Sequence, residues 1–331
     1  MEYLIGIDVG TTGTKSTLFS IDGDMVDISY RGYELSYPHE GWVEQNPDDW
    51  WNALIGTVKD ITTRNRCEKD VVAMSLSTQG GALVLLDEHF NSICPSVSWL
   101  DTRANETTEQ LLQKISIEEL YKMSGWPIKN GLNFPVIFWF KEKQPELYEN
   151  ARFFASTIDY INYLLTGRFV IDYSNLALTM FLDLNKRDIS DSALHIAGID
   201  RSSVPEVLPS GQVIGKLTKE AAKKLGLSQD VVVVSGAHDQ YCANIGAGAQ
   251  SKIWLQIVAD VCNIQVSLPE ISEAACAGAA VLAGTGSGIF HSIEEASKKV
   301  TKDKSIIIPN QMNSEVYKEL YQKFVLNLEY V

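Results

Sequence analysis

Asp239 is the residue of this sequence whose neighbours best suit it to acid–base chemistry. It follows four valines at positions 231–234 and a Ser-Gly-Ala exit, and it lies between His238 and Gln240. The valines predict a short buried strand, and ligands bind at the open ends of strands in an α/β sheet. A carboxylate there can act as a general base or contact a metal. Asp239 is equally suited to capping a helix at residues 240–245, so both interpretations stay open.

A second carboxylate, Asp8, ends the apolar strand predicted at residues 4–8 and precedes a loop rich in glycine and threonine. The loop supplies Gly10, Thr11, Thr12, Gly13 and Lys15. Its glycines allow close approach of the backbone, and its N–H groups and hydroxyls can point at an oxyanion. Asp8 can hold Mg²⁺ there through water. These residues predict a phosphate-binding loop, with an ordinary glycine-rich hairpin as the alternative.

Two commoner phosphate-binding motifs are excluded. A Walker loop needs glycine directly before its lysine, and here Thr14 precedes Lys15. A dinucleotide-binding fingerprint leads into a helix, whereas the residues at 16–19 predict a strand. A phosphate site at this loop would therefore lie between two strands of an antiparallel hairpin.

Two further groups of residues suggest a pocket for a polar ligand. They are Gln79, Gly80 and Gly81 after the strand predicted at 71–77, and Trp99, Asp101 and Arg103 further along the chain. The glycine pair can open space in which the glutamine amide meets a ligand, or it can form a β-bulge. A tryptophan beside opposite charges is typical of sugar sites, but the same residues can form a surface ion pair.

Composition and charge limit the classes of partner. The chain has 331 residues and a formal net charge of −14, without a cluster of lysine and arginine. This argues against nucleic acid and anionic membranes as partners. Five scattered cysteines without a Cys-x-x-Cys pair argue against a zinc site and favour a reducing cytoplasm. No apolar run approaches the roughly 20 residues that span a bilayer.

The predicted elements place these residues in an α/β arrangement. The chain opens as an antiparallel meander over residues 4–8, 16–19 and 25–33. Asn46-Pro47 starts an amphipathic helix, with asparagine as its N-cap and proline at its first position. Residues 105–165 are mostly helical, 169–172 form a strand, and 172–175 form a polar turn. A helix at 217–225 leads to the valine strand.

Several segments, in this order, resemble the FGGY carbohydrate kinases of the actin-like phosphotransferase superfamily. The segments are residues 6–15, 41–47, 75–79, 99–103, 159–167, 172–175 and 235–240. None is specific alone, but the ordered set covers nearly all of residues 1–249. The resemblance implies an α/β fold with an RNase-H-like (actin-like ATPase) N-terminal domain, and ATP-dependent phosphorylation of a sugar hydroxyl.

The resemblance also implies roles for individual residues. Asp239 matches the base that takes the proton from the attacking hydroxyl, and Gln240 follows it in the substrate site. Asp8 matches the acid near Mg²⁺, and residues 10–13 match the first phosphate loop. The two groups at 79–81 and 99–103 fall in the sugar site. A ketose such as xylulose is the expected substrate, with ATP and Mg²⁺ as cofactors.

The chain departs from the family at two places within this region. Pentulose kinases often carry Met-His where this chain has Gly80-Gly81, which predicts a pocket wall without side chains. The family usually has lysine three residues before the tryptophan of the helix predicted near residues 134–141, and here that position is Val136. The first of these departures leaves the identity of the sugar open.

Residues 250–331 resemble a shortened remnant of a second RNase-H-like domain. The turn at 246–251, with Gly248, resembles the family's adenosine-contacting turn, but it follows Asp239 almost directly. The strands, helices and second phosphate loop that normally intervene are missing. We expect a small-residue helix at 273–283, a glycine turn at 284–288 and a last helix at 314–326. Without a sheet to cover, these helices should expose apolar surface or bury it by forming a homo-oligomer. The alternative function is therefore that of a shortened homologue that binds sugar with impaired catalysis.

Overall fold

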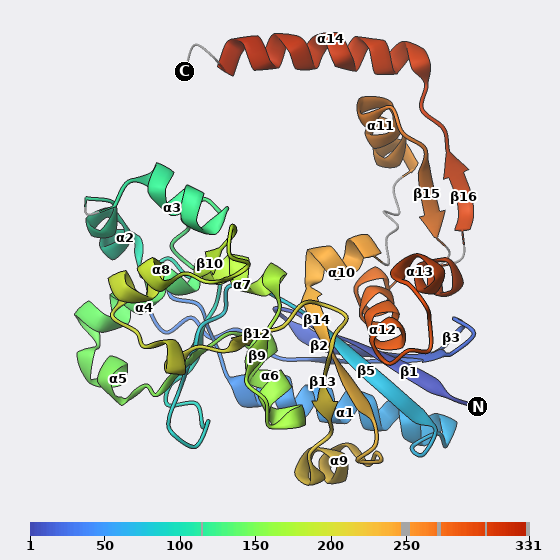
Figure 1. Cartoon of the computed structure of the whole chain (residues 1–331), viewed down its shortest axis with the longest axis horizontal. Coiled ribbons are helices and arrows are strands. Elements are labelled where there is room, and N and C mark those ends of the chain that lie inside the picture. The colour runs from blue at the N-terminus through green and yellow to red at the C-terminus, as the bar shows by residue number, and fades with distance from the viewer. Residues whose placement is uncertain (114, 246–251, 270–272, 302, 329–331) are drawn as a thin grey trace.

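The computed structural model describes residues 1–113, 115–245, 252–269, 273–301 and 303–328, and a six-stranded sheet forms its centre (Figure 1). The strands lie in the order β13-β14-β5-β1-β2-β3. They are β1 (Tyr3–Val9), β2 (Gly13–Ser20), β3 (Met25–Gly32), β5 (Val71–Thr78), β13 (Val213–Lys216) and β14 (Val232–His238). β1, β5 and β14 run parallel, and the other strands run antiparallel to their neighbours. The carboxyl ends of the three parallel strands therefore meet at one edge, as expected for a ligand site.

One face of the sheet is covered by α1 (Pro47–Asn65), which packs on β2 and β3. Its predicted start is confirmed, because the Asn46 side chain accepts a hydrogen bond of 3.1 Å from the Asp48 N–H. The face toward the sheet carries apolar residues at helical spacing, including Trp50, Leu54, Val58 and Ile61, all fully buried. The opening meander is confirmed by the continuous pairing of β1 with β2 and of β2 with β3.

The other face is covered by α12 (Ala274–Gly286), which packs on β1, β5 and β14 (Figure 1). α10 (Asp239–Ile245) and α13 (Ile293–Thr301) pack beside it. Residues 276–284 are buried, and the small alanine and glycine residues among them let the helix lie close to the strands. The expectation that this helix lacks a sheet is wrong, because the sheet of the first 249 residues receives it. The glycine turn predicted from residue 284 is also wrong, because the helix continues to Gly286.

A mostly helical region lies beside the sheet (Figure 1). Its helices are α2 (Asn105–Leu112), α3 (Ile117–Ser124), α4 (Asn133–Lys143), α5 (Pro145–Asn150), α6 (Thr157–Thr166), α7 (Tyr173–Thr179) and α8 (Asp191–Ala197), with the 3₁₀ turn η1 (Arg201–Ser203). A further helix, α9 (Lys219–Leu225), lies below the sheet in the view of Figure 1. Four short strand pairs join the helices: β4 (Glu44–Gln45) with β7 (Ser96–Val97), β6 (Val84–Leu86) with β8 (Phe153–Ala155), β9 (Val170–Ile171) with β12 (Glu206–Val207), and β10 (Leu182–Asp183) with β11 (Asp188–Ile189).

Two local predictions in this region have different outcomes. Gly167 ends α6 in the left-handed conformation at φ 74°, as the glycine C-cap predicted. The polar turn predicted at 172–175 is instead the start of α7. The Asp172 side chain accepts hydrogen bonds from the N–H groups of Ser174 and Asn175, at 2.8 and 3.2 Å, and so caps that helix.

The last part of the chain forms an arm that projects from the body (Figure 1). It contains α11 (Lys252–Cys262), the antiparallel pair β15 (Val266–Pro269) and β16 (Asp303–Ile307), and α14 (Gln311–Leu328), which packs on α11. The sequence analysis missed β16. Large apolar side chains are exposed on the arm, as expected for this part of the chain: Val261, Ile264, Ile306, Ile308, Met312, Val316, Leu320 and Tyr321. Among the described residues, no helix is both long and apolar enough to span a membrane.

Candidate active site

A pocket opens where the carboxyl ends of the parallel strands face the helical region. It encloses about 690 Å³ of empty space, including its open mouth. Six of its lining residues were predicted from the sequence: Thr11, Gln79, Gly80, Trp99, Asp239 and Gln240. The sheet topology explains this convergence, because the loops after β1 and β5 and the start of α10 all leave the same edge.

Asp239 reaches the pocket because β14 is longer than predicted. The strand does not end at the valines but passes a register shift between Val234 and Ala237 and continues to His238. A Cβ atom at Gly236 would lie 1.7 Å from the Leu76 carbonyl oxygen, so only glycine fits there. Asp239 is the first residue of α10, and its side chain remains 42% exposed, so it can contact a ligand.

His238 lies between this carboxylate and the protein interior. Its side chain is only 9% exposed, and its Nε2 lies 3.1 Å from Asp239 Oδ1. Asp239 Oδ1 is buried and has no hydrogen-bond partner among the described residues, so the two groups lie close together without a hydrogen bond. Burial lowers the pKa of His238, and the charges of Asp239 and Asp172 offset part of that effect. The imidazole is therefore neutral at pH 7.

Asp8 lies near the end of β1, where Ser77 of β5 donates a hydrogen bond of 2.7 Å to its Oδ1. Burial raises the pKa of Asp8, the bond from Ser77 lowers it, and the charge of Asp239 raises it again. Within the described part of the chain, no group of three or more His, Cys, Asp or Glu side chains gathers as a metal site. The single carboxylate of Asp8 fits Mg²⁺, because this ion takes one or two carboxylates and completes its shell with water and substrate phosphates.

The loop after Asp8 is a tight turn with free donors. Gly10 donates its N–H to the Gly13 carbonyl at 3.0 Å, which closes the turn. Among the hydrogen bonds of the described residues, none uses the backbone N–H of Thr11 or Thr12. These two groups can therefore receive an anion. Trp99 Nε1 donates to Thr11 Oγ1 at 3.1 Å, which ties the loop to the pocket wall.

The Lys15 side chain contacts the start of α12. It lies on β2 and forms an ion pair with Glu273, the N-cap residue of α12. Its charge is thus already partly balanced by a carboxylate. A role for Lys15 in phosphate binding remains a prediction, as does the role of Gly248, which lies outside the described residues.

Gln79 is held by a chain of hydrogen bonds that leads back to the loop after β1. Its Nε2 donates to Gln45 Oε1 at 2.9 Å, and Gln45 Nε2 donates to the Thr11 carbonyl at 2.8 Å. Gln79 Oε1 is buried and has no partner among the described residues. This oxygen is therefore a candidate acceptor for a hydroxyl group of the ligand.

Asp101 and Arg103 do not line the pocket, although the sequence analysis assigned them to it. Their side chains are 0% and 3% exposed. Arg103 pairs with Asp101 at 2.9 Å and with Glu44 at 2.8 Å, and its guanidinium lies 3.8 Å from the Trp42 ring centre. Asp101 also accepts the Val43 N–H at 2.6 Å. Of the predicted residues in segment 99–103, only Trp99 therefore lines the pocket, and the buried pair of Asp101 and Arg103 holds the segment in place.

Sequence reasoning missed part of the pocket. Trp126 and Lys129 reach it from the loop between α3 and α4, Leu132 from the residue before α4, and Leu178 from α7. The only signal was the Gly125-Trp126-Pro127 break in the helical region. Gly81, with φ at +68°, shapes the turn after Gly80 but is not among the lining residues.

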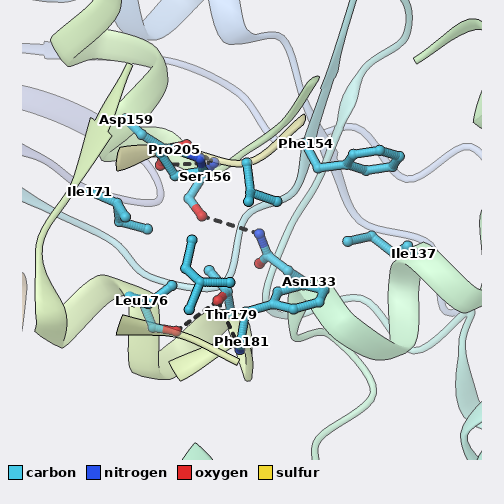
Figure 2. A pocket seen from close by; sticks show the side chains of 12 residues that line it. Asn133, Ile137, Phe154, Ser156, Asp159, Ile171, Leu176, Thr179, Phe181 and Pro205 are labelled. Atoms are coloured by element: carbon cyan, nitrogen blue, oxygen red, sulfur yellow. Dashed lines mark hydrogen bonds between the residues drawn. The ribbon is translucent and has the colours of Figure 1, made fainter. Parts of the chain in front are cut away.

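A separate cavity lies between α4, α6 and α7 (Figure 2). Asn133 Nδ2 donates to Ser156 Oγ at 3.1 Å across it, and Asp159 accepts the Ser156 N–H (Figure 2). Its other walls are mainly apolar, and Asp159 serves the start of α6 as the second half of a capping box. We assign this cavity to core packing.

Comparisons with known proteins agree with this geometry. The family profile for the FGGY family of carbohydrate kinases, N-terminal domain, matches residues 3–246, and the profile for the C-terminal domain matches residues 217–287. A xylulose kinase of Staphylococcus xylosus is 29% identical over 248 residues, which are 75% of this chain and 51% of that protein. A gluconokinase of Bacillus subtilis is 31% identical over 251 residues, 76% of this chain and 49% of that protein. The chain thus spans about half the length of these relatives.

Solved structures support the fold. A ligand-bound xylulose kinase from Lactobacillus acidophilus matches with a TM-score of 0.88 at 17% identity, over 100% of this chain and 98% of that one. A gluconate kinase from the same organism matches with a TM-score of 0.88 at 17% identity, over 99% and 98%. At such identities these matches show the α/β, actin-like fold alone. The N-terminal family profile, which matches more than half of the chain, shows that the chain belongs to the FGGY family of carbohydrate kinases.

Proposed function

We propose that this chain catalyses ATP-dependent phosphorylation of a sugar hydroxyl. The observation that carries the proposal is the position of Asp239. It is a half-exposed carboxylate in a pocket that Thr11 of the loop after Asp8 also lines, and the Thr11 and Thr12 N–H groups have no hydrogen-bond partner among the described residues. A proton acceptor and a phosphate cradle on one pocket are the two parts that phosphoryl transfer to an alcohol requires.

The residues of the chain have distinct parts in this reaction. The N–H groups of Thr11 and Thr12 bind phosphate oxygens, and Asp8 would hold Mg²⁺, which would neutralise the charge of bound ATP. Asp239 orients the sugar hydroxyl and accepts its proton as the oxygen bonds to the γ-phosphorus. The bond from that phosphorus to the bridging oxygen breaks, and ADP leaves. General base catalysis of this kind contributes about 10²–10⁴-fold.

A ketose such as xylulose is the first candidate substrate. The pocket offers sugars an aromatic wall in Trp99 and Trp126 and hydrogen-bonding groups in Gln79 and Gln240. Several relatives of similar identity are xylulose kinases. Because the glycines at positions 80 and 81 add no specific contact, the choice among ketoses depends on these other residues.

A sugar acid is the second candidate, and Lys129 favours it. Lys129 lines the pocket and forms no ion pair with any of the described side chains. A carboxylate on the sugar would balance this charge. The gluconokinase relative matches as well as the xylulose kinases do. Replacing Lys129 with methionine should weaken gluconate binding and leave xylulose binding unchanged.

The alternative function is sugar binding without turnover. Calorimetry of MgATP binding separates the two functions, with Asp8→Ala as the control. Binding that the substitution abolishes, followed by phosphorylation of a sugar in a panel of ketoses and aldonates, supports the kinase. A folded chain that binds sugar but not MgATP supports the alternative. The same samples show by light scattering whether the exposed arm forms a homo-oligomer.

A further inference from the structure

We infer that His238 is a positioning residue for the base Asp239, and that position 80 is glycine because the imidazole of His238 occupies the space of a side chain there. The inference rests on the proposed function, because it assumes that Asp239 takes the proton. It adds a residue to the site and gives a reason for the glycine at position 80.

The position of His238 is fixed by its surroundings. The backbone N–H of His238 donates a hydrogen bond of 2.9 Å to Ser174 Oγ, which ties the end of β14 to α7. Its ring lines the pocket next to Asp239 and lies 6.2 Å from the Tyr241 ring, centre to centre. Nε2 is 3.1 Å from Asp239 Oδ1. The charged groups that act on the ring are Asp239 from α10 and Asp172 from the start of α7.

The hydrogen-bond pattern determines which ring nitrogen carries the proton. Nδ1 is buried and has no partner among the described residues. A proton on Nδ1 would be a buried donor without an acceptor, which is costly. The neutral ring therefore carries its proton on Nε2, facing the carboxylate. Hydrogen bonds of this kind are often poorly aligned before substrate binds and tighten in the complex.

A donor at Nε2 has a defined effect on the base. It engages Oδ1 of Asp239 and leaves Oδ2 for the sugar hydroxyl. It also limits rotation of a carboxylate that is otherwise half-exposed and whose Oδ1 has no other hydrogen-bond partner in the described part of the chain. Fixing this orientation keeps the accepting oxygen in line with the hydroxyl, and small errors of placement cost about 10²-fold in rate.

The geometry at Gly80 links the two positions. A Cβ atom there would lie 2.9 Å from His238 Cδ2, 3.2 Å from His238 Nε2 and 2.1 Å from Leu178 Cδ1. The leucine methyl group is the end of a flexible side chain and can move aside. The imidazole cannot move without leaving Asp239. Any side chain at position 80 would therefore displace the ring that positions the base.

Kinetics with matched variants test the inference. His238→Gln keeps a donor near the position of Nε2 and should retain activity within about fivefold, whereas His238→Leu should lower kcat by about 10- to 100-fold with little change in KM for the sugar. His89→Gln, at an exposed histidine outside the site, is the control and should match the wild type. Equal kcat for the leucine variant and the wild type would overturn the inference.

A double-mutant cycle tests the link to Gly80. Gly80→Ala alone should lower kcat about as much as His238→Leu. In a His238→Ala background, where the ring is gone, the same alanine should cost at most about twofold more. Fully additive effects would show that the two residues act independently and would overturn the explanation of the glycine.

A titration separates failure of this inference from failure of the proposed function, because it needs no turnover. The NMR signals of His238, assigned with His238→Gln, should titrate below the ordinary pKa of about 6.5. In Asp239→Asn, which removes the neighbouring charge, His238 should titrate at still lower pH. Identical titration in both proteins would overturn the inference even in an active kinase. If the pKa of His238 falls in Asp239→Asn but the wild type phosphorylates no sugar, the contact between His238 and Asp239 is supported and the proposed function is rejected.

Discussion

Replacing Arg103 with alanine should destabilise the fold strongly without a specific effect on sugar binding. The guanidinium is 3% exposed, bonded to Asp101 and Glu44, and stacked 3.8 Å from the Trp42 ring centre. Its removal would leave the fully buried Asp101 carboxylate without its counter-charge. Removing one partner of a buried pair costs about 3–5 kcal/mol of unfolding free energy.

Urea unfolding followed by circular dichroism measures this loss, and calorimetry measures the sugar affinity of the variant under conditions where it remains folded. Arg103→Lys should recover little of the stability, because lysine cannot make the two-pronged contact with Asp101. Arg201→Ala removes an exposed ion pair with Asp188 and should cost about 1 kcal/mol or less. A stable Arg103→Ala variant with selectively weakened sugar binding would refute the reasoning and return Arg103 to the site.

Two further predictions concern other parts of the same framework. Burial raises the pKa of Asp159, so its contribution to stability is complete below about pH 4 and is lost as the pH rises toward the folded-state pKa. Asp159→Asn should therefore gain in Tm over the wild type as the pH rises from 4 to 8, and a constant difference would contradict this. Trp99→Phe keeps the aromatic wall but loses the bond to Thr11 Oγ1, and steady-state kinetics should show KM for MgATP raised about 2- to 10-fold, with little change for the sugar. An unchanged KM would show that this bond does not hold the loop.

The sequence predicted most of the elements that form the site, because each carries local signals. The apolar strands and the Asn46-Pro47 helix start depend on neighbouring residues only, and all are present. The loop after Asp8 and the residue Asp239 also reach the same edge, since parallel strands leave the sheet on one side. Local patterns and topology together were sufficient here.

Other features depend on contacts that no local pattern encodes. The strand β14 passes Gly236 and continues to His238 because Leu76 of the neighbouring strand approaches its backbone. The helix α12 packs on β1, which lies more than two hundred residues earlier in the chain. Asp101 and Arg103 have the composition of a sugar site, but Glu44 and Trp42 draw them into a buried ion pair. In each case the deciding partner is distant in sequence.

The most direct test of the proposed function is MgATP-dependent phosphorylation of D-xylulose and gluconate by the wild type and by Asp239→Asn. Release of ADP measures turnover, and calorimetry measures sugar binding in both proteins. We expect the wild type to phosphorylate one of the two sugars. The variant should bind that sugar with similar affinity and turn it over about 10²–10⁴-fold more slowly. An unchanged kcat in the variant, or a wild type that binds sugar and MgATP without transferring phosphate, would contradict the role assigned to Asp239.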